Sequence, residues 1–131
     1  METDYAYTGK GKRYRENCKD NSVESSGIKT ASTPWKEIKR GSVDGMKSAL
    51  AQQPIAVSID AESDKFSFYQ NGIFDYSKCG TFLDHAVLLV GYGAENGKEF
   101  WIMKNSWASD WGEDGYMRLA ITGNGVGMCG I

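Results

Sequence analysis

Residues 83–90 read LDHAVLLV, the most apolar segment of the chain, and they contain its single histidine, His85. A short segment that is mostly apolar around His85 predicts a β-strand that is buried on both faces. The tripeptide GYG at 91–93 follows directly and predicts the end of that strand. Any imidazole chemistry in this chain must therefore come from a side chain embedded in the wall of a β-sheet.

A helix and a strand are predicted upstream of this segment. Residues 42–52 indicate a helix, because Ser42 can cap it and apolar side chains recur three and seven positions apart. Pro54 ends the helical pattern, and residues 55–59 (IAVSI) then alternate as a strand does. Residues 61–69 fit neither pattern clearly and could hold one helical turn.

Two further strands are predicted downstream. The tetrapeptide ENGK at 95–98 predicts a hairpin turn, which leads into a strand over residues 100–103. Residues 115–120 (GYMRLA) form the last predicted strand. Together these elements predict the α+β class, with an antiparallel sheet or open barrel and one short helix.

Composition narrows the possible classes of function. The chain has 131 residues and a mass of 14.5 kDa, which fits one domain or part of one. Lys and Arg total 15 against 17 Asp and Glu, so the net charge of −2 excludes a nucleic-acid binder that works through net basic charge. The longest apolar run, residues 86–90, is far too short to span a membrane. Residues 1–30 are polar and are predicted to be loop or extended chain, which leaves a β-rich domain in residues 31–131.

His85 has two interpretations. In the first, it is a core histidine whose ring is satisfied by a backbone carbonyl. In the second, it is a general base, which needs an orienting group at one ring nitrogen and a nucleophile at the other. Asn105, at the end of the next predicted strand, is the candidate orienting group, since an amide oxygen can fix the imidazole tautomer without adding charge. Trp107 and Trp111 follow closely and could shield that bond from water. Asp84 is a weaker candidate, because adjacent strand residues point to opposite faces.

No nucleophile carries an activating sequence motif. The candidate hydroxyl groups are those of Ser58, Thr81 and Ser106. Cys79 lies six residues before His85 and could serve as a thiolate, although a disulfide with Cys129, which is also followed by glycine, is favoured. Three cysteines and one histidine match the ligand count of a zinc site, but their spacing lacks the Cys-x-x-Cys pattern, so no metal site is expected.

Two segments resemble the papain-like cysteine peptidases. Residues 84–93 (DHAVLLVGYG) resemble the histidine segment of that family, and residues 105–116 (NSWASDWGEDGY) resemble its asparagine segment. Shorter matches extend the resemblance over nearly the whole chain: QPIAV at 53–57, GIF at 72–74, CG at 79–80 and CGI at 129–131. The chain is thus similar to the C-terminal domain portion of a papain-like or cathepsin L-like peptidase, the portion that carries the His and Asn segments.

The resemblance implies a catalytic role for several matching residues. His85 would form the imidazolium partner of a catalytic thiolate and then protonate the leaving amine, while Asn105 would hold its ring. Trp107 would cover the bond between them. Trp111 would border the leaving-group side of the cleft.

The same resemblance implies substrate contacts and disulfides. The residues expected to line the pocket for the side chain two residues before the cut are Ser58, Leu83 and Ala86. The backbone carbonyl of Asp84 would form a hydrogen bond with the substrate main chain. Cys79 would pair with Cys129, and Cys18 would pair with a cysteine in the family's first domain.

One hallmark of the family has no match in these residues. The chain lacks the family's Cys-Gly-Ser/Ala-Cys-Trp segment, which holds the catalytic cysteine, and the glutamine of the oxyanion hole that precedes it. The usual separations of about 130 residues from nucleophile to histidine and about 150 to asparagine place that segment about 45 residues before Met1. We therefore expect a domain that is incomplete at both ends, in which residues 1–30 lead in from a missing first domain. The expected partner is an N-terminal papain-like domain or chain that supplies the catalytic cysteine, and the isolated chain is expected to be inactive.

The resemblance implies part of a cysteine-type endopeptidase that acts on peptide or protein substrates without a cofactor, a nucleic acid or a membrane. One alternative is a non-catalytic papain-like relative that serves as a binding or structural subunit, which would have lost the cysteine at the nucleophile position. Another is a self-sufficient hydrolase that uses Cys79. The use of disulfides, together with the family, predicts a location in the lysosome, the vacuole or the extracellular space.

Overall fold

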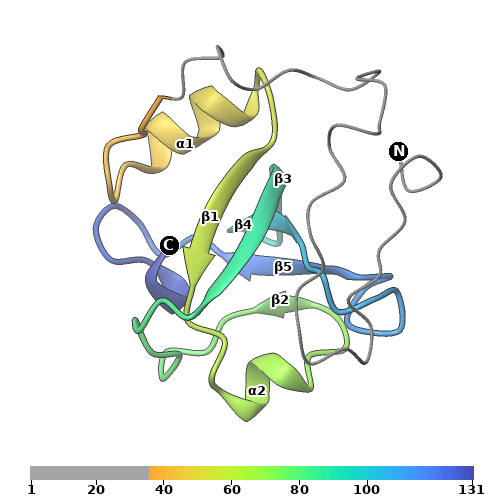
Figure 1. The fold of residues 1–131 in the computed structure, drawn as a ribbon. Helices are drawn as coiled ribbons and strands as arrows, with labels where there is room; N and C mark the ends of the chain where they lie inside the picture. The colour runs from red at the N-terminus through yellow and green to blue at the C-terminus, as the bar shows by residue number, and fades with distance from the viewer. Residues whose placement is uncertain (1–35) are drawn as a thin grey trace, which may run out of the picture. The chain divides into compact units, whose positions relative to one another are not determined.

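A computed structural model describes residues 36–131 and places them in a mixed five-stranded sheet with two short α-helices (Figure 1). The strands are β1 (Ile55–Ile59), β2 (Ile73–Phe74), β3 (His85–Glu95), β4 (Lys98–Lys104) and β5 (Tyr116–Ala120), in the spatial order β1-β3-β4-β5-β2. The helices are α1 (Val43–Leu50) and α2 (Asp64–Ser67), and a 3₁₀ turn, η2, spans Met128–Gly130. The α+β class is confirmed. The segment predicted at residues 1–30, with Cys18, lies outside the described residues.

Helix α1 forms where the sequence predicts it. Ser42 Oγ accepts a hydrogen bond from the backbone N–H of Gly45 at 3.1 Å, and Asn124 Oδ1 accepts one from the N–H of Val43 at 3.0 Å. These two side chains satisfy donors that a helix N-terminus leaves without partners. The buried side chain of Met46 fixes the helix to the core. The prediction of a helix over residues 42–52 is confirmed for residues 43–50.

Removal of the Ser42 cap should destabilise the domain measurably. We expect Ser42→Ala to lower the free energy of unfolding by about 1 kcal/mol, because the Gly45 N–H loses its acceptor. Urea unfolding followed by circular dichroism measures the change. Ser48→Ala is the matched control, since Ser48 is exposed on the same helix and alanine has the higher helix propensity. An equal loss in both variants would contradict the capping role.

Strands β3 and β4 form the hairpin predicted at residues 95–98. Glu95 pairs with Lys98, and the two residues between them, Asn96 and Gly97, have φ angles of +50° and +79°. Both angles suit the two-residue turn that matches the twist of a hairpin. The glycines at residues 91–93 predict the end of the strand, and this prediction is wrong, because β3 continues to Glu95.

The glycines in β3 have a packing role that explains this difference. A Cβ added to Gly93 would lie 2.9 Å from the ring of Phe100 on β4, so glycine admits the aromatic ring against the strand. The pairing register shifts between Leu89 and Gly91, which leaves Val90 as an extra residue in a β-bulge. A glycine within this strand therefore marks a close approach of a neighbouring side chain and not a strand end.

Strand β3 is buried on one face only, so the prediction of two buried faces is wrong. Val87 and Leu89 lie in the core, beside Ile55 of β1. On the opposite face Ala86 is exposed and Leu88 is partly covered. The apolar run has the composition of a doubly buried strand, but the described residues cover only one of its sides.

The prediction of an antiparallel sheet holds for β1, β3, β4 and β5, but not for β2. Strand β2 pairs with β5 in parallel, with Ile73 opposite Arg118 and Phe74 opposite Leu119. Helix α2 occupies part of the ambiguous stretch at residues 61–69, so the described residues hold two short α-helices where one was predicted. Its Phe66 is fully buried and anchors it to the core. No helix within residues 36–131 is long and apolar enough to cross a lipid bilayer.

Candidate active site

The sheet brings the side chains of His85 and Asn105 together. His85 opens β3, and Asn105 follows the last residue of β4, the antiparallel neighbour of β3. His85 Nε2 lies 2.8 Å from Asn105 Oδ1, and the asparagine is 8% exposed. The ring of His85 therefore has an amide oxygen as its partner, in the arrangement that a general base requires of its orienting group.

A second contact fixes the direction of this hydrogen bond. The backbone N–H of Ser106 lies 2.8 Å from the same oxygen of Asn105. Because a backbone N–H can only donate, the atom that faces it must be the amide oxygen and not the amide nitrogen. His85 Nε2 must then carry the hydrogen that it donates to that oxygen. The other ring nitrogen, Nδ1, remains to exchange a proton with a reacting group.

Aromatic rings surround the His85–Asn105 pair. The Trp107 ring lies 5.0 Å from the His85 ring between centroids, at 33°, and stays partly exposed. The buried ring of Phe66 meets Trp107 edge-on at 5.6 Å and His85 at 6.5 Å. Trp111 is buried below Trp107, and its Nε1–H donates to the carbonyl of Ser67 at 3.0 Å. A hydrogen bond beside this apolar surface is stronger than one in open water.

The residues from 105 to 115, here called the Asn105 loop, carry both tryptophans. The backbone N–H of Asn105 donates to the carbonyl of Gly115 at 3.0 Å, which closes the loop on itself. Gly112 has a φ of +61°, and a Cβ at that position would lie 2.5 Å from the carbonyl oxygen of Tyr116. Only glycine fits there, so the glycine after Trp111 in the sequence motif has a physical cause.

The residues predicted to contact substrate lie on and beside the first two strands of the sheet. Ser58 of β1 pairs with Ala86 of β3, and both are exposed on the face opposite His85. Leu83 is 41% exposed just before β3. Asp84 turns its carboxylate to the backbone N–H of Ala61, at 2.9 Å, so this side chain is not an orienting group for His85. The role of these residues in substrate binding stays a prediction.

Cys79 and Cys129 form a disulfide. The thiolate that a self-sufficient hydrolase would need at Cys79 is therefore not available, and that alternative is wrong. Cys129 lies in η2 and is buried, and its carbonyl accepts from the backbone N–H of Asp60, directly after β1. The disulfide thus ties the end of the described chain to the segment that leads into β3.

Comparison with known proteins identifies the family. The sequence pattern described as "Papain family cysteine protease" matches residues 1–131. This chain belongs to the papain family of cysteine proteases. It is 41% identical over 137 residues to cysteine proteinase RD21A of Arabidopsis thaliana and 40% identical over 132 residues to chymopapain of Carica papaya. In both comparisons 100% of this chain is covered.

A solved papain-family structure has the same fold. Bromelain from Ananas comosus, in complex with the inhibitor E64, matches 99% of this chain with a TM-score of 0.84 and 39% identity. The chain spans 57% of that bromelain chain, 28% of cysteine proteinase RD21A and 36% of chymopapain. The described sheet therefore corresponds to the C-terminal half of the papain-family fold.

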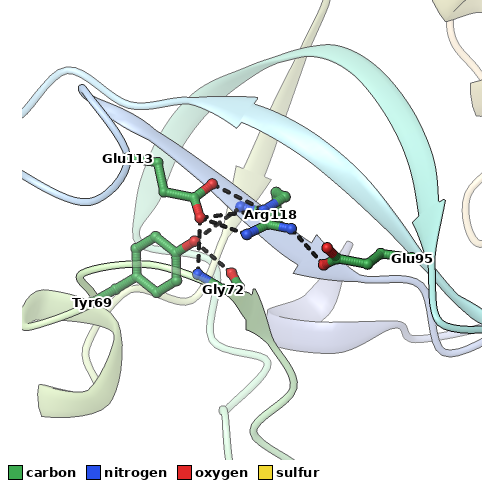
Figure 2. A network of polar contacts seen from close by, with 5 residues as sticks. All are labelled: Tyr69, Gly72, Glu95, Glu113 and Arg118. Atoms are coloured by element: carbon green, nitrogen blue, oxygen red, sulfur yellow. Dashed lines mark hydrogen bonds and ion pairs between the residues drawn. The ribbon is translucent and has the colours of Figure 1, made fainter.

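A polar network lies beside the C-terminal end of the Asn105 loop in this papain-family chain (Figure 2). Glu113 accepts from Arg118 Nε at 3.0 Å and from Nη2 at 2.7 Å, and it also accepts from the backbone N–H of Gly72 at 2.8 Å. Arg118 Nη1 donates to Glu95 at 2.7 Å, and the hydroxyl of Tyr69 donates to the carbonyl of Gly72 at 2.6 Å. The sequence alone did not indicate this network, because Glu113 and Gly72 lie 41 residues apart in the chain.

The network changes the ionisation of two of its members. The hydrogen bonds from Arg118 hold the pKa of Glu113 below its usual 4.5. Burial raises the pKa of the Tyr69 hydroxyl above its usual 10.0. Since the pKa of Glu113 is lowered by folding, its ion pair contributes full stability above the usual pKa and loses it as the pH falls through the lowered value. Glu113 therefore stays ionised to a lower pH than a glutamate with the usual pKa does.

Proposed function

We propose that this chain is the second-domain part of a papain-like cysteine endopeptidase, in which His85 and Asn105 serve a catalytic cysteine supplied from outside these residues. The observation that carries the proposal is the 2.8 Å contact between His85 Nε2 and the oxygen of Asn105, which leaves Nδ1 as the reactive nitrogen. Family membership supplies the class of reaction. The ring of Trp107 beside His85 supports the proposed cover over the pair.

The reaction would use Nδ1 of His85 to move one proton in each half. Nδ1 takes the proton of the cysteine thiol, and the thiolate attacks the carbonyl carbon of the substrate. The tetrahedral intermediate collapses when Nδ1 returns the proton to the departing amine, which leaves a thioester. A water then adds its oxygen to that carbon and gives a proton to Nδ1, and the thiol is restored as the carboxylic acid leaves. Asn105 keeps Nδ1 aimed at the sulfur throughout.

Substrate would bind on the exposed residues around the start of β3. We assign Ser58, Leu83 and Ala86 to the pocket for the side chain two residues before the cut, and their exposure supports this. The carbonyl of Asp84 would pair with the substrate main chain. Trp111 is buried, so any contribution to the leaving-group side of the cleft would pass through Trp107.

The proposed partner is an N-terminal papain-like domain or chain, linked to this one through Cys18 if both cysteines are present. The exposure of Ala86 and Ser58 on the outer face of β3 and β1 supports a partner on that side, because the described residues leave these positions uncovered. A disulfide-bonded peptidase fits a lysosomal, vacuolar or extracellular location.

The proposal predicts that peptidase activity belongs to the assembled protein and not to the 131-residue chain. Native material containing this chain should hydrolyse a fluorogenic peptide and be inactivated by E64, the inhibitor bound to bromelain. The chain alone should give no turnover, because it lacks the nucleophile. Intact masses before and after reduction identify any second chain that carries the cysteine. Native material that is complete but neither cleaves peptides nor reacts with E64 would instead be a non-catalytic, binding or structural relative.

A further inference from the structure

Within residues 36–131, every hydrogen bond of the Asn105 side chain is made by its oxygen. Within residues 36–131, the buried Nδ2 group of Asn105 has no hydrogen-bond partner. The oxygen accepts two hydrogen bonds, but among the described residues none is made by the amide nitrogen. The position of that oxygen therefore depends on the backbone of the Asn105 loop, because a functional side chain needs supporting residues to hold it in place.

Four residues close the Asn105 loop at its base, and we call them the loop neck: Asn105, Glu113, Gly115 and Tyr116. Asn105 donates its backbone N–H to Gly115, and Glu113 and Tyr116 exchange two backbone hydrogen bonds of 2.9 and 3.0 Å. The neck thus sets the position from which the side chain of Asn105 reaches His85.

Glu113 connects the neck to two other elements. Its carboxylate accepts two hydrogen bonds from Arg118 on β5 and a third from the backbone N–H of Gly72, just before β2. The carbonyl of Gly72 in turn accepts from Tyr69, whose ring packs 5.5 Å from that of Trp111 between centroids. Figure 2 shows the carboxylate of Glu113 between Arg118 and the Tyr69–Gly72 segment. One carboxylate therefore ties the loop that bears Asn105 to β5 and to the segment that follows α2.

We propose that Glu113 is a positioning residue for the His85–Asn105 pair. Its two-point contact with Arg118 and its bond to Gly72 fix the loop neck, and the neck holds the Asn105 oxygen against His85 Nε2. This inference rests on the proposed function for the catalytic role of the His85–Asn105 pair. The contact between the two side chains can be measured without activity.

Glu95 provides a matched control within the same network. It accepts from Arg118 Nη1 at 2.7 Å, but it lies at the end of β3, and within residues 36–131 it forms no hydrogen bond with the loop neck. Its side chain is 53% exposed, against 29% for Glu113. Removal of either carboxylate takes one ion pair from Arg118, and only removal of Glu113 releases the neck.

The first test uses the single histidine of the full chain. Labelling with ¹⁵N-histidine gives one imidazole, and long-range ¹H–¹⁵N spectra in a buffer that keeps the ring neutral identify which nitrogen carries the hydrogen. The wild-type chain and Glu95→Gln should show the Nε2–H tautomer alone. Glu113→Gln should show a second population with the hydrogen on Nδ1, because the amide oxygen no longer stays at Nε2.

The second test uses the assembled protease. Glu113→Gln should lower kcat about tenfold with KM unchanged, as a displaced orienting group does, while Glu95→Gln stays within about twofold. Far-UV circular dichroism confirms that each variant is folded. If Glu113→Gln does not fold, Arg118→Lys replaces it under the same criteria, since lysine keeps the charge and loses the two-point contact.

Three outcomes would overturn the proposal. The first is a folded Glu113→Gln chain that keeps the single Nε2–H tautomer. The second is an equal change in the Glu95→Gln chain. The third is loss of fold in both Glu113→Gln and Arg118→Lys, which would make the ion pair a requirement of the whole domain. The tautomer decides on Glu113 even if the assembled protein proves to have no peptidase activity, so the two proposals can fail separately.

Discussion

Replacement of His85 by alanine in the assembled protease should lower kcat/KM by about 10⁴-fold or more. These 131 residues contain one histidine, so no other imidazole of this chain can take its place. Without the ring, the cysteine thiol loses the group that removes its proton, and the departing amine loses the group that protonates it. Both halves of the reaction depend on the same nitrogen, Nδ1, and the loss should therefore appear in kcat and not in KM.

Hydrolysis of a fluorogenic peptide measures this change, with the active sites counted by E64 where it still reacts. Lys104→Ala is the matched control, because Lys104 is exposed at the end of β4 next to Asn105. That variant should keep its activity. Retention of one tenth of the wild-type activity by His85→Ala would contradict the proposed function, whatever the result for the control.

Removal of the disulfide should give the largest loss of stability. We expect the double variant Cys79→Ala/Cys129→Ala to lose about 4 kcal/mol of unfolding free energy, as the loop-closure model gives for a sequence separation of 50 residues. Alanine is preferred to serine at these positions, because Cys129 is 1% exposed and a buried hydroxyl without a partner would add its own cost. The bond constrains the unfolded chain and also fixes η2 beside β1.

Urea unfolding of the oxidised chain and of the double variant measures the difference. Wild-type chain unfolded in the presence of dithiothreitol is the control, since it lacks the bond but keeps both side chains. The two should agree. A loss of less than about 1 kcal/mol in both would show that the bond adds little constraint to the unfolded chain.

The sequence predicted those parts of the fold that depend on local chemistry. Ser42 marks the start of α1 because its hydroxyl can accept from the first turn of a helix. Asn96 and Gly97 mark the hairpin because both tolerate positive φ. That hairpin places His85 and Asn105 on neighbouring strands, so their proximity can be predicted from the sequence, while their catalytic role rests on the family resemblance.

Other features depend on contacts that a local pattern does not contain. Strand β2 has two residues, too few for an alternating pattern, and it forms because β5 offers a parallel partner. Gly93 predicts the end of a strand, but it lies within β3, where the absence of a side chain leaves room for the ring of Phe100. Glu113 gains its importance from Gly72, 41 residues away, and no pattern within the Asn105 loop indicates that contact.

The β3–β4 hairpin also affects the order in which the domain can assemble. His85 and Asn105 are separated by 20 residues, whereas Cys79 and Cys129 are separated by 50. Closing the shorter loop costs about 0.8 kcal/mol less conformational entropy than closing the longer one. The contact between His85 and Asn105 therefore closes a shorter stretch of chain than the disulfide does. Local contacts of this kind favour early formation, so the folding chain can join His85 to Asn105 before its cysteines meet.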